Sequence, residues 1–253
     1  MVYRKAGDEL VIIYSSLQLE DMGLAATAAF DKFYYGEKDD PDRVFPRATP
    51  IIPFAQEFLG LSIRYASICS DKSICGLTAY SDTSVQFWDS GVKRDLLIKR
   101  NEILIDSHLR SFDRTTQSRC RFTIAHECAH QLLYHISTND VMDKCDVQYA
   151  ARSNYLPREP KSKEDWNEWQ ANYLAAVILM PQKEIRLAMD KFARNRTLTS
   201  YDGRFNYSDN FILTIISSVL CVSKAAARIR LEQLGYVKQK PFSQFSDPLE
   251  IYP

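Results

Sequence analysis

The spacing of hydrophobic residues predicts a chain of mixed helix and strand. In several stretches apolar residues recur every three or four positions, as they do on the buried face of a helix. Elsewhere short apolar runs are bounded by Asp, Ser and Gly, which is typical of strands. The predicted helices cover residues 19–35, 54–59, 162–180, 182–194, 211–220 and 223–234. The predicted strands cover residues 61–68, 76–80, 84–88 and 102–106, so a small sheet is expected in the first half of the chain.

Another helix is predicted around residues 121–130, which read Arg-Phe-Thr-Ile-Ala-His-Glu-Cys-Ala-His. Its apolar residues recur at helical spacing, which predicts a helix that is buried on the side away from its histidines. These apolar residues are Phe122, Ala125, Cys128, Ala129, Leu132 and Leu133. The sequence that follows, from His135 to Lys163, is polar and irregular. Its length predicts a functional loop rather than a packed element.

The pattern H-E-x-x-H within this helix predicts a metal site. His126 and His130 lie one turn apart, because a helix advances about 100° per residue, and they can therefore bind one ion together. Glu127 lies on the flank of that face, where it can hold a water bound to the metal and act as a general base. The chain has only four histidines, so the motif rarely arises by chance in such a composition. The alternative is a pair of ordinary histidines beside an ordinary glutamate.

Composition narrows the class of protein but not its function. A chain of 253 residues with 45% hydrophobic residues is long enough to bury a core. Lys plus Arg equals Asp plus Glu at 32 each, so no charge excess favours nucleic acid or a membrane surface. The apolar run at 10–14 is too short for the core of a signal peptide. The apolar run at 173–180 is far shorter than the ~20 residues that span a bilayer. Six cysteines without C-x-x-C spacing fit reduced thiols, so we expect a cytoplasmic protein with no membrane partner.

A catalytic zinc needs three protein ligands and one open position, so the third ligand must lie outside the motif. Glu168 is the best candidate, because it projects from a separate predicted helix and precedes the run Ala-Asn-Tyr-Leu-Ala-Ala. Asn172, one turn after Glu168, could hydrogen-bond the free ring nitrogen of a histidine. His135 is a poorer candidate, since it lies about 140° around the helix from the ligand face. Cys145 and Asp146 could reach the metal from the loop, but no motif supports them.

The two motifs together resemble the ImmA/IrrE family of bacterial metallopeptidases. Residues 121–130 and 168–181 look like the two halves of its signature and occur in the same order. Shorter segments also look similar, at residues 76–80, 103–106 and 222–235. The resemblance therefore extends over roughly residues 20–240. Asn172 stands where many members of the family have Asp, which would make its support of the site electrostatically weaker.

This resemblance implies an α+β fold, with a zincin-like metallopeptidase domain, a small N-terminal sheet, an active-site helix and a C-terminal helical element that resembles a helix-turn-helix. It implies Zn²⁺ bound by His126, His130 and Glu168, with Glu127 as the catalytic base. Manganese or iron would suit the same ligands. The implied substrate is a cognate helix-turn-helix repressor of mobile-element or stress-response genes. A different protein, such as an antitoxin, is an alternative substrate.

The C-terminal helices suggest a rival function. Residues 222–240 carry five cationic side chains against one carboxylate, which would attract phosphate weakly. Charged helix faces are usually just solvated, so we expect no direct binding of nucleic acid. The rival is a DNA-binding or protein-binding regulator in which the metal is only structural or vestigial. We predict four segments: an N-terminal helical extension and linker at 1–48, a catalytic domain at 49–181, a C-terminal helical subdomain at 182–240 and a tail at 241–253.

Overall fold

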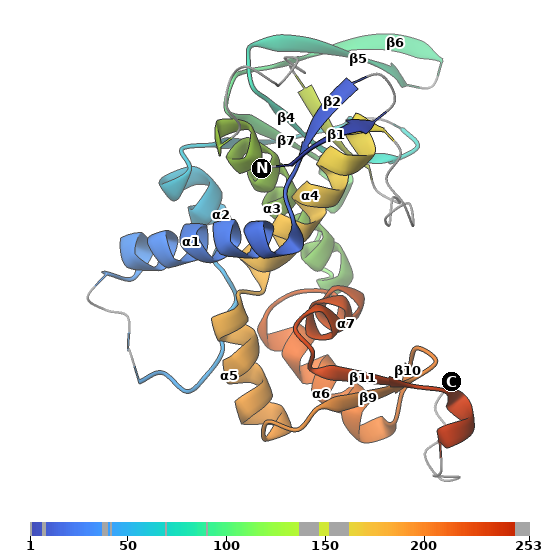
Figure 1. Cartoon of the computed structure of the whole chain (residues 1–253). Helices are drawn as coiled ribbons and strands as arrows, with labels where there is room; N and C mark the ends of the chain where they lie inside the picture. Colours follow the sequence, from blue (N-terminus) through green and yellow to red (C-terminus); the bar gives the residue numbers. More distant parts are fainter. Residues whose placement is uncertain are drawn as a thin grey trace. The chain divides into compact units, whose positions relative to one another are not determined.

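The computed structural model describes most of the chain. The described residues are 2–6, 9–36, 40, 42–68, 70–89, 91–136, 147–151 and 162–245. The chain divides into two compact units (Figure 1). The first unit comprises residues 1–36 and 50–178, and the second comprises residues 37–49 and 179–253. The domain boundaries that the sequence suggests stay predictions.

A four-stranded sheet lies at the centre of the first unit. Its strand order is β3-β7-β4-β8, with β3 parallel to β7 and the other neighbours antiparallel. These strands are β3 (Ser62–Ala66), β4 (Ile74–Ala79), β7 (Glu102–Asp106) and β8 (Val147–Ala151). Two antiparallel hairpins accompany the sheet. They are formed by β1 (Val2–Ala6) with β2 (Glu9–Ile13), and by β5 (Thr83–Asp89) with β6 (Val92–Ile98).

The two faces of this sheet have different partners. An apolar cluster joins one face to the β5–β6 hairpin, and its buried members are Ile68, Leu77, Ala79, Val85, Ile98 and Leu104. Side chains alternate along a strand, so Gly76 and Thr78 of β4 lie on the opposite face. Thr78 accepts a hydrogen bond there from Gln131 of helix α3. One face of β4 is therefore held by apolar packing, and the opposite face is held by a hydrogen bond to α3.

The helices of the first unit include two that cross at very short distance. The helical elements are α1 (Ser16–Tyr34), α2 (Ile51–Pro53), the π-helical turn η2 (Phe54–Phe58), the 3₁₀ turn η3 (Ser107–Leu109), α3 (Arg114–Ile136) and α4 (Lys163–Leu179). Gly23 lies in the interior of α1, and a Cβ atom there would be 2.4 Å from Val177 Cγ1 of α4. Glycine in a helix interior usually costs stability. Here it is needed because a side chain would separate the two helices.

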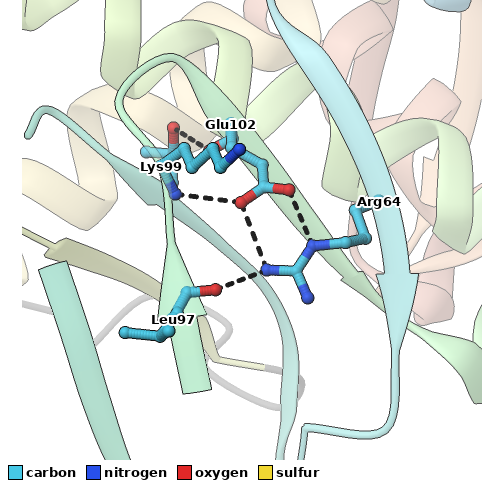
Figure 2. Close-up of polar contacts among 5 residues, drawn as sticks. Arg64, Leu97, Lys99 and Glu102 are labelled. Atoms are coloured by element: carbon cyan, nitrogen blue, oxygen red, sulfur yellow. Dashed lines mark hydrogen bonds and ion pairs between the residues drawn. The ribbon is translucent and has the colours of Figure 1, made fainter. Parts of the chain in front are cut away.

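An ion pair joins three strands at the edge of the sheet (Figure 2). Arg64 of β3 donates from Nε to Glu102 Oε1 at 2.7 Å and from Nη2 to Glu102 Oε2 at 3.2 Å. The same Nη2 donates to Leu97 O of β6 at 2.6 Å, and Lys99 N donates to Glu102 Oε2 at 3.0 Å. The hydrogen bond from Arg64 is the main reason why the pKa of Glu102 lies below its ordinary value. Glu102 is therefore ionised and bonded on both oxygens at neutral pH.

Replacing Glu102 with Gln is expected to lower the free energy of unfolding by about 1–3 kcal/mol at neutral pH, because Arg64 loses its ionised partner. The folded pKa of Glu102 is depressed, so its stabilisation is present above its ordinary pKa of 4.5 and is lost as the pH falls through the folded value. The difference in the free energy of unfolding between wild type and Glu102→Gln should accordingly disappear as the pH falls below about 4.5. Urea unfolding between pH 7 and pH 3 measures this difference. Glu57→Gln, at an exposed site, is the control and should show no such gap.

The second unit combines a small sheet with a bent pair of helices. Its elements are α5 (Gln182–Ala193), β9 (Leu198–Tyr201), β10 (Arg204–Phe205), α6 (Tyr207–Val219), α7 (Lys224–Gln233), β11 (Val237–Lys240) and η4 (Phe242–Gln244). The strand order is β10-β9-β11. Helices α6 and α7 meet at 104°, and Ser223 caps α7 by accepting from Ala226 N. Within the described residues no single helix is long and apolar enough to cross a membrane; only this bent pair passes on length and composition.

The predicted mixed fold is confirmed in its main elements, and the differences have physical causes. Strand β6 is absent from the prediction because most of its residues are exposed and three in a row are charged, so no apolar alternation marks it. The predicted loop at 135–163 is wrong in part, because α3 continues to Ile136 and β8 pairs with β4. Strand β8 is defined by backbone pairing at the sheet edge, which side-chain periodicity does not report.

Candidate metal centre

Hydrogen bonds hold helix α3 along strand β4. Gln131 Nε2 donates to Thr78 Oγ1 at 2.6 Å and to Ala79 O at 3.1 Å. Tyr80, just after β4, donates from its hydroxyl to His130 O at 3.3 Å. All five residues are buried. The helix with the H-E-x-x-H motif is thereby fixed to the sheet at the level of His130.

The absence of a side chain at Gly76 lets β4 pass close to Glu127. A Cβ atom at this position would be 2.5 Å from Thr123 Cγ2 and 2.9 Å from Glu127 Oε1. The pairing of β4 with β8 is irregular at the same place, between Ile74 and Gly76. Such irregularities are common beside active sites because they redirect the strand. As a result, Glu127 is 0% exposed, although a glutamate with an ordinary pKa is ionised at neutral pH and normally lies at the surface.

Three side chains from helices α3 and α4 meet in one cluster. His126 Nε2 and His130 Nε2 are 3.0 Å apart. Glu168 of α4 brings Oε2 to 3.1 Å from His126 Nε2 and Oε1 to 3.0 Å from His130 Nε2. The ligand atoms of all three residues lie within 4.8 Å of one another, so this group could hold a metal ion. Both histidines are 3% exposed, whereas the side chain of Glu168 is 26% exposed.

The amino-acid sequence matches the model of one protein family. Residues 78–232, more than half of the chain, match the peptidase M78 family, described as the IrrE N-terminal-like domain. The chain belongs to this family. Membership of peptidase M78 confirms the resemblance to ImmA/IrrE proteins and suggests a metallopeptidase-like function. All three residues of the cluster lie within the matched range.

Similarity outside the family model is weak. A solved structure of a Mycobacterium tuberculosis transcriptional regulator matches with 11% sequence identity and a TM-score of 0.37. The match covers 84% of this chain and 47% of that structure, so the chain spans about half of its length. A likeness at this level carries no information about function. No curated protein shows significant similarity to the chain.

The metal that the M78 family implies fits these residues. Two histidines and one carboxylate are a donor set that catalytic zinc sites use. Within the described part of the chain, both carboxylate oxygens of Glu127 and Nδ1 of His126 are buried without a hydrogen-bond partner. Buried polar atoms normally have partners, and two buried carboxylates repel each other. A cation held by His126, His130 and Glu168 would offset this repulsion.

The two carboxyl groups of the site have opposite pKa shifts. Burial raises the pKa of Glu127 well above its ordinary value, and the charge of Glu168 adds to the shift. Burial alone would also raise the pKa of Glu168, but hydrogen bonds with His126 and His130 lower it to about 2. Burial is the main reason why the pKa of His130 is lowered. Glu168 is thus ionised, as a ligand should be, while burial favours the protonated form of Glu127 in the metal-free site.

The other candidates are not joined to this cluster by any contact among the described residues. In the described part of the chain, Asn172 makes no hydrogen bond with either histidine, so its supporting role stays a prediction without a contact. His135 is exposed at the end of α3. Cys145 and Asp146 lie outside the described residues.

Sequence reasoning missed the residues that fix α3 to β4. These are Gly76, Thr78, Tyr80 and Gln131. The one available signal was a glycine inside a predicted strand, which often marks a close approach of the backbone to another group. Gln131 gives no such signal, because its partners are about 50 residues away in the sequence.

Gly76→Ala is expected to lower both stability and catalytic function. The new Cβ meets Thr123 Cγ2 and Glu127 Oε1, so β4 or α3 must shift, at a cost of about 1–3 kcal/mol. Thermal unfolding and peptidase assays on the same preparations measure the two effects. Adding Thr123→Ser removes the closer methyl group and keeps the hydroxyl that donates to Arg119 O. The double variant should recover part of the lost stability, because the contact with Glu127 Oε1 remains. Wild-type stability of Gly76→Ala alone would contradict the argument.

Proposed function

We propose that the protein is a zinc-dependent endopeptidase with a zincin-like catalytic fold, which hydrolyses a peptide bond in one regulatory protein. The observation that carries the proposal is the cluster of His126, His130 and Glu168 beside Glu127, which is buried and not a member of the cluster. Three ligands from two helices match a catalytic zinc site, whereas structural zinc sites have four protein ligands. Membership of a peptidase family supports the same reading.

In this mechanism His126, His130 and Glu168 would hold the metal. The metal, when bound, supplies a Lewis acid that polarises the scissile carbonyl and makes water more acidic. Glu127 takes a proton from the attacking water and delivers it to the amide nitrogen that leaves. Glu127 accepts the proton in its ionised form, and the burial that raises its pKa is a property of the site before the metal binds. Gln131 and Tyr80 keep α3 in place on β4 throughout.

The proposed substrate is a cognate helix-turn-helix repressor of a mobile element or stress regulon, as in the ImmA/IrrE proteins that the chain resembles. The cations of the C-terminal helices give little support to the rival function in DNA binding. Arg230 is 0% exposed and donates to Met180 O. Arg228 binds Gly203 O and Glu232, and Lys224 binds Asn210. Of the five cations at 222–240, three thus have partners within the protein, and Lys224, Lys238 and Lys240 are exposed.

The test is incubation of the zinc-loaded protein with the repressor encoded beside its gene. We expect two fragments, whose masses give the cleavage site, and no cleavage after treatment with a chelator. Metal that is retained without cleavage of the repressor, together with binding of operator DNA, would favour the rival regulator with a structural metal. If a neighbouring antitoxin is cut and the repressor is not, the endopeptidase stands and the substrate is corrected.

A further inference from the structure

Gln170 is a buried amide on α4, two residues after Glu168, and it is 3% exposed. Its Oε1 accepts a hydrogen bond from Tyr14 N at 2.8 Å, and its Nε2 donates to Ile12 O at 3.2 Å. The side-chain amide therefore pairs with the end of strand β2 as a peptide group of a neighbouring strand would. Both bonds are buried and join segments more than 150 residues apart, at separations of 156 and 158.

Gln170 lies on the face of α4 that packs against the N-terminal segment. Gln170, Leu174 and Val177 are spaced by four and three residues, so they share one face of the helix. A side chain at Gly23 of α1 would collide with Val177 and crowd Leu174, which shows how close α1 lies to this face. Glu168 is about 200° around the helix from Gln170. It therefore lies on the opposite side of α4 from Gln170, where it contacts the histidines of α3.

A capping box stabilises the first turn of α4, but it does not fix the position of the helix relative to the rest of the unit. Ser162 N donates to Asp165 Oδ2, and Asp165 N donates back to Ser162 Oγ, both at 3.1 Å. This reciprocal cap stabilises the first turn but binds the helix only to itself. The two bonds of Gln170, by contrast, tie the turn that carries Glu168 to a different part of the unit.

We propose that Gln170 is a positioning residue for the metal site, because it joins α4 to the β2–α1 junction and so holds Glu168 in place opposite His126 and His130. The inference rests on the metal binding of the proposed function but not on peptidase activity. The partners of Gln170 lie at residues 12–14, whereas the family match begins at residue 78. The N-terminal segment outside the matched region is thus part of the support of the site.

The test compares Co²⁺ binding by metal-free wild type and Gln170→Met, which keeps the size of the side chain but forms neither hydrogen bond. Titration should show affinity about 10- to 100-fold weaker, the usual effect of losing an outer support of a ligand. The visible spectrum at saturation should also change, because Glu168 then reaches the ion in a different geometry. Gln18→Met is the matched control. It makes the same substitution in the capping box of α1 and leaves the bonds of Gln170 intact.

A second variant keeps the test decisive if Gln170→Met does not fold. Gln170→Asn keeps a neutral amide on a side chain that is shorter by one methylene, so it should fold and show a smaller loss of affinity. Unchanged Co²⁺ affinity and spectrum in a folded Gln170 variant would overturn the inference, as would an equal loss in Gln18→Met. If wild type itself binds no Co²⁺, the proposed function fails as well. If wild type and variants bind alike, only the role of Gln170 fails.

Discussion

Replacing Glu127 with Gln is expected to reduce peptide-bond cleavage by about 10²- to 10⁴-fold while the protein still binds its metal. The substitution keeps the shape of the side chain under Gly76 and leaves the three ligand residues intact. It removes the group to which the proposed mechanism assigns both the uptake of a proton from water and its return to the leaving nitrogen. Cleavage rates at saturating repressor, with metal content measured on the same samples, test both parts of this expectation.

Stability gives an independent signature of the same substitution. The pKa of Glu127 is raised in the folded protein, so the folded state keeps a proton that the unfolded chain releases above the ordinary pKa of 4.5. In the metal-free protein this group therefore becomes increasingly destabilising as the pH rises above that value. Metal-free Glu127→Gln should be at least as stable as wild type at pH 7. Glu164→Gln, at an exposed site on α4, is the control and should change neither rate nor stability. Cleavage by Glu127→Gln at the wild-type rate would remove Glu127 from the mechanism.

The cluster could be predicted from the sequence because its two halves are local patterns. H-E-x-x-H places His126 and His130 on one helical face whatever the rest of the fold. Glu168 could be predicted because it stands in a second helix whose boundaries are marked by Ser162 and Pro181. The structure brings the three residues within 4.8 Å of one another, although no periodicity specifies how α3 and α4 meet. That meeting was expected from the resemblance and from the ligand requirement of zinc.

The contacts that orient these helices could not be predicted, because their partners are distant in the sequence. Gln170 pairs with Ile12 and Tyr14, and Gln131 pairs with Thr78, through hydrogen bonds that no periodic pattern records. The prediction that α3 is buried on the side away from its histidines is confirmed at Ala125, Cys128 and Ala129. His126 and His130 are also buried, beside Glu168 of α4, and this could not be predicted from the periodicity of α3 alone.

Removing a ligand is expected to have the opposite effect to Glu127→Gln, with loss of the metal itself. Glu168→Ala or His126→Ala should retain no metal after dialysis under conditions in which wild type keeps one ion per cluster, because two ligands do not complete a zinc site. The metal-free Glu168→Ala protein should stay folded. In the wild-type structure the Nε2 atoms of His126 and His130 are 3.0 Å apart, so one ring can donate a hydrogen bond to the other when Glu168 is removed.

Metal content by mass spectrometry and thermal unfolding on the same samples separate loss of metal from loss of fold. Glu164→Ala is the matched control, since it removes an exposed carboxylate from the same helix and should keep the metal. Full retention by Glu168→Ala would show that the third ligand is another group. Cys145 and Asp146 would then be the first candidates, because they precede α4 on the segment that connects it to α3. The role of Gln170 would fall with that result, because its effect on the metal acts through Glu168.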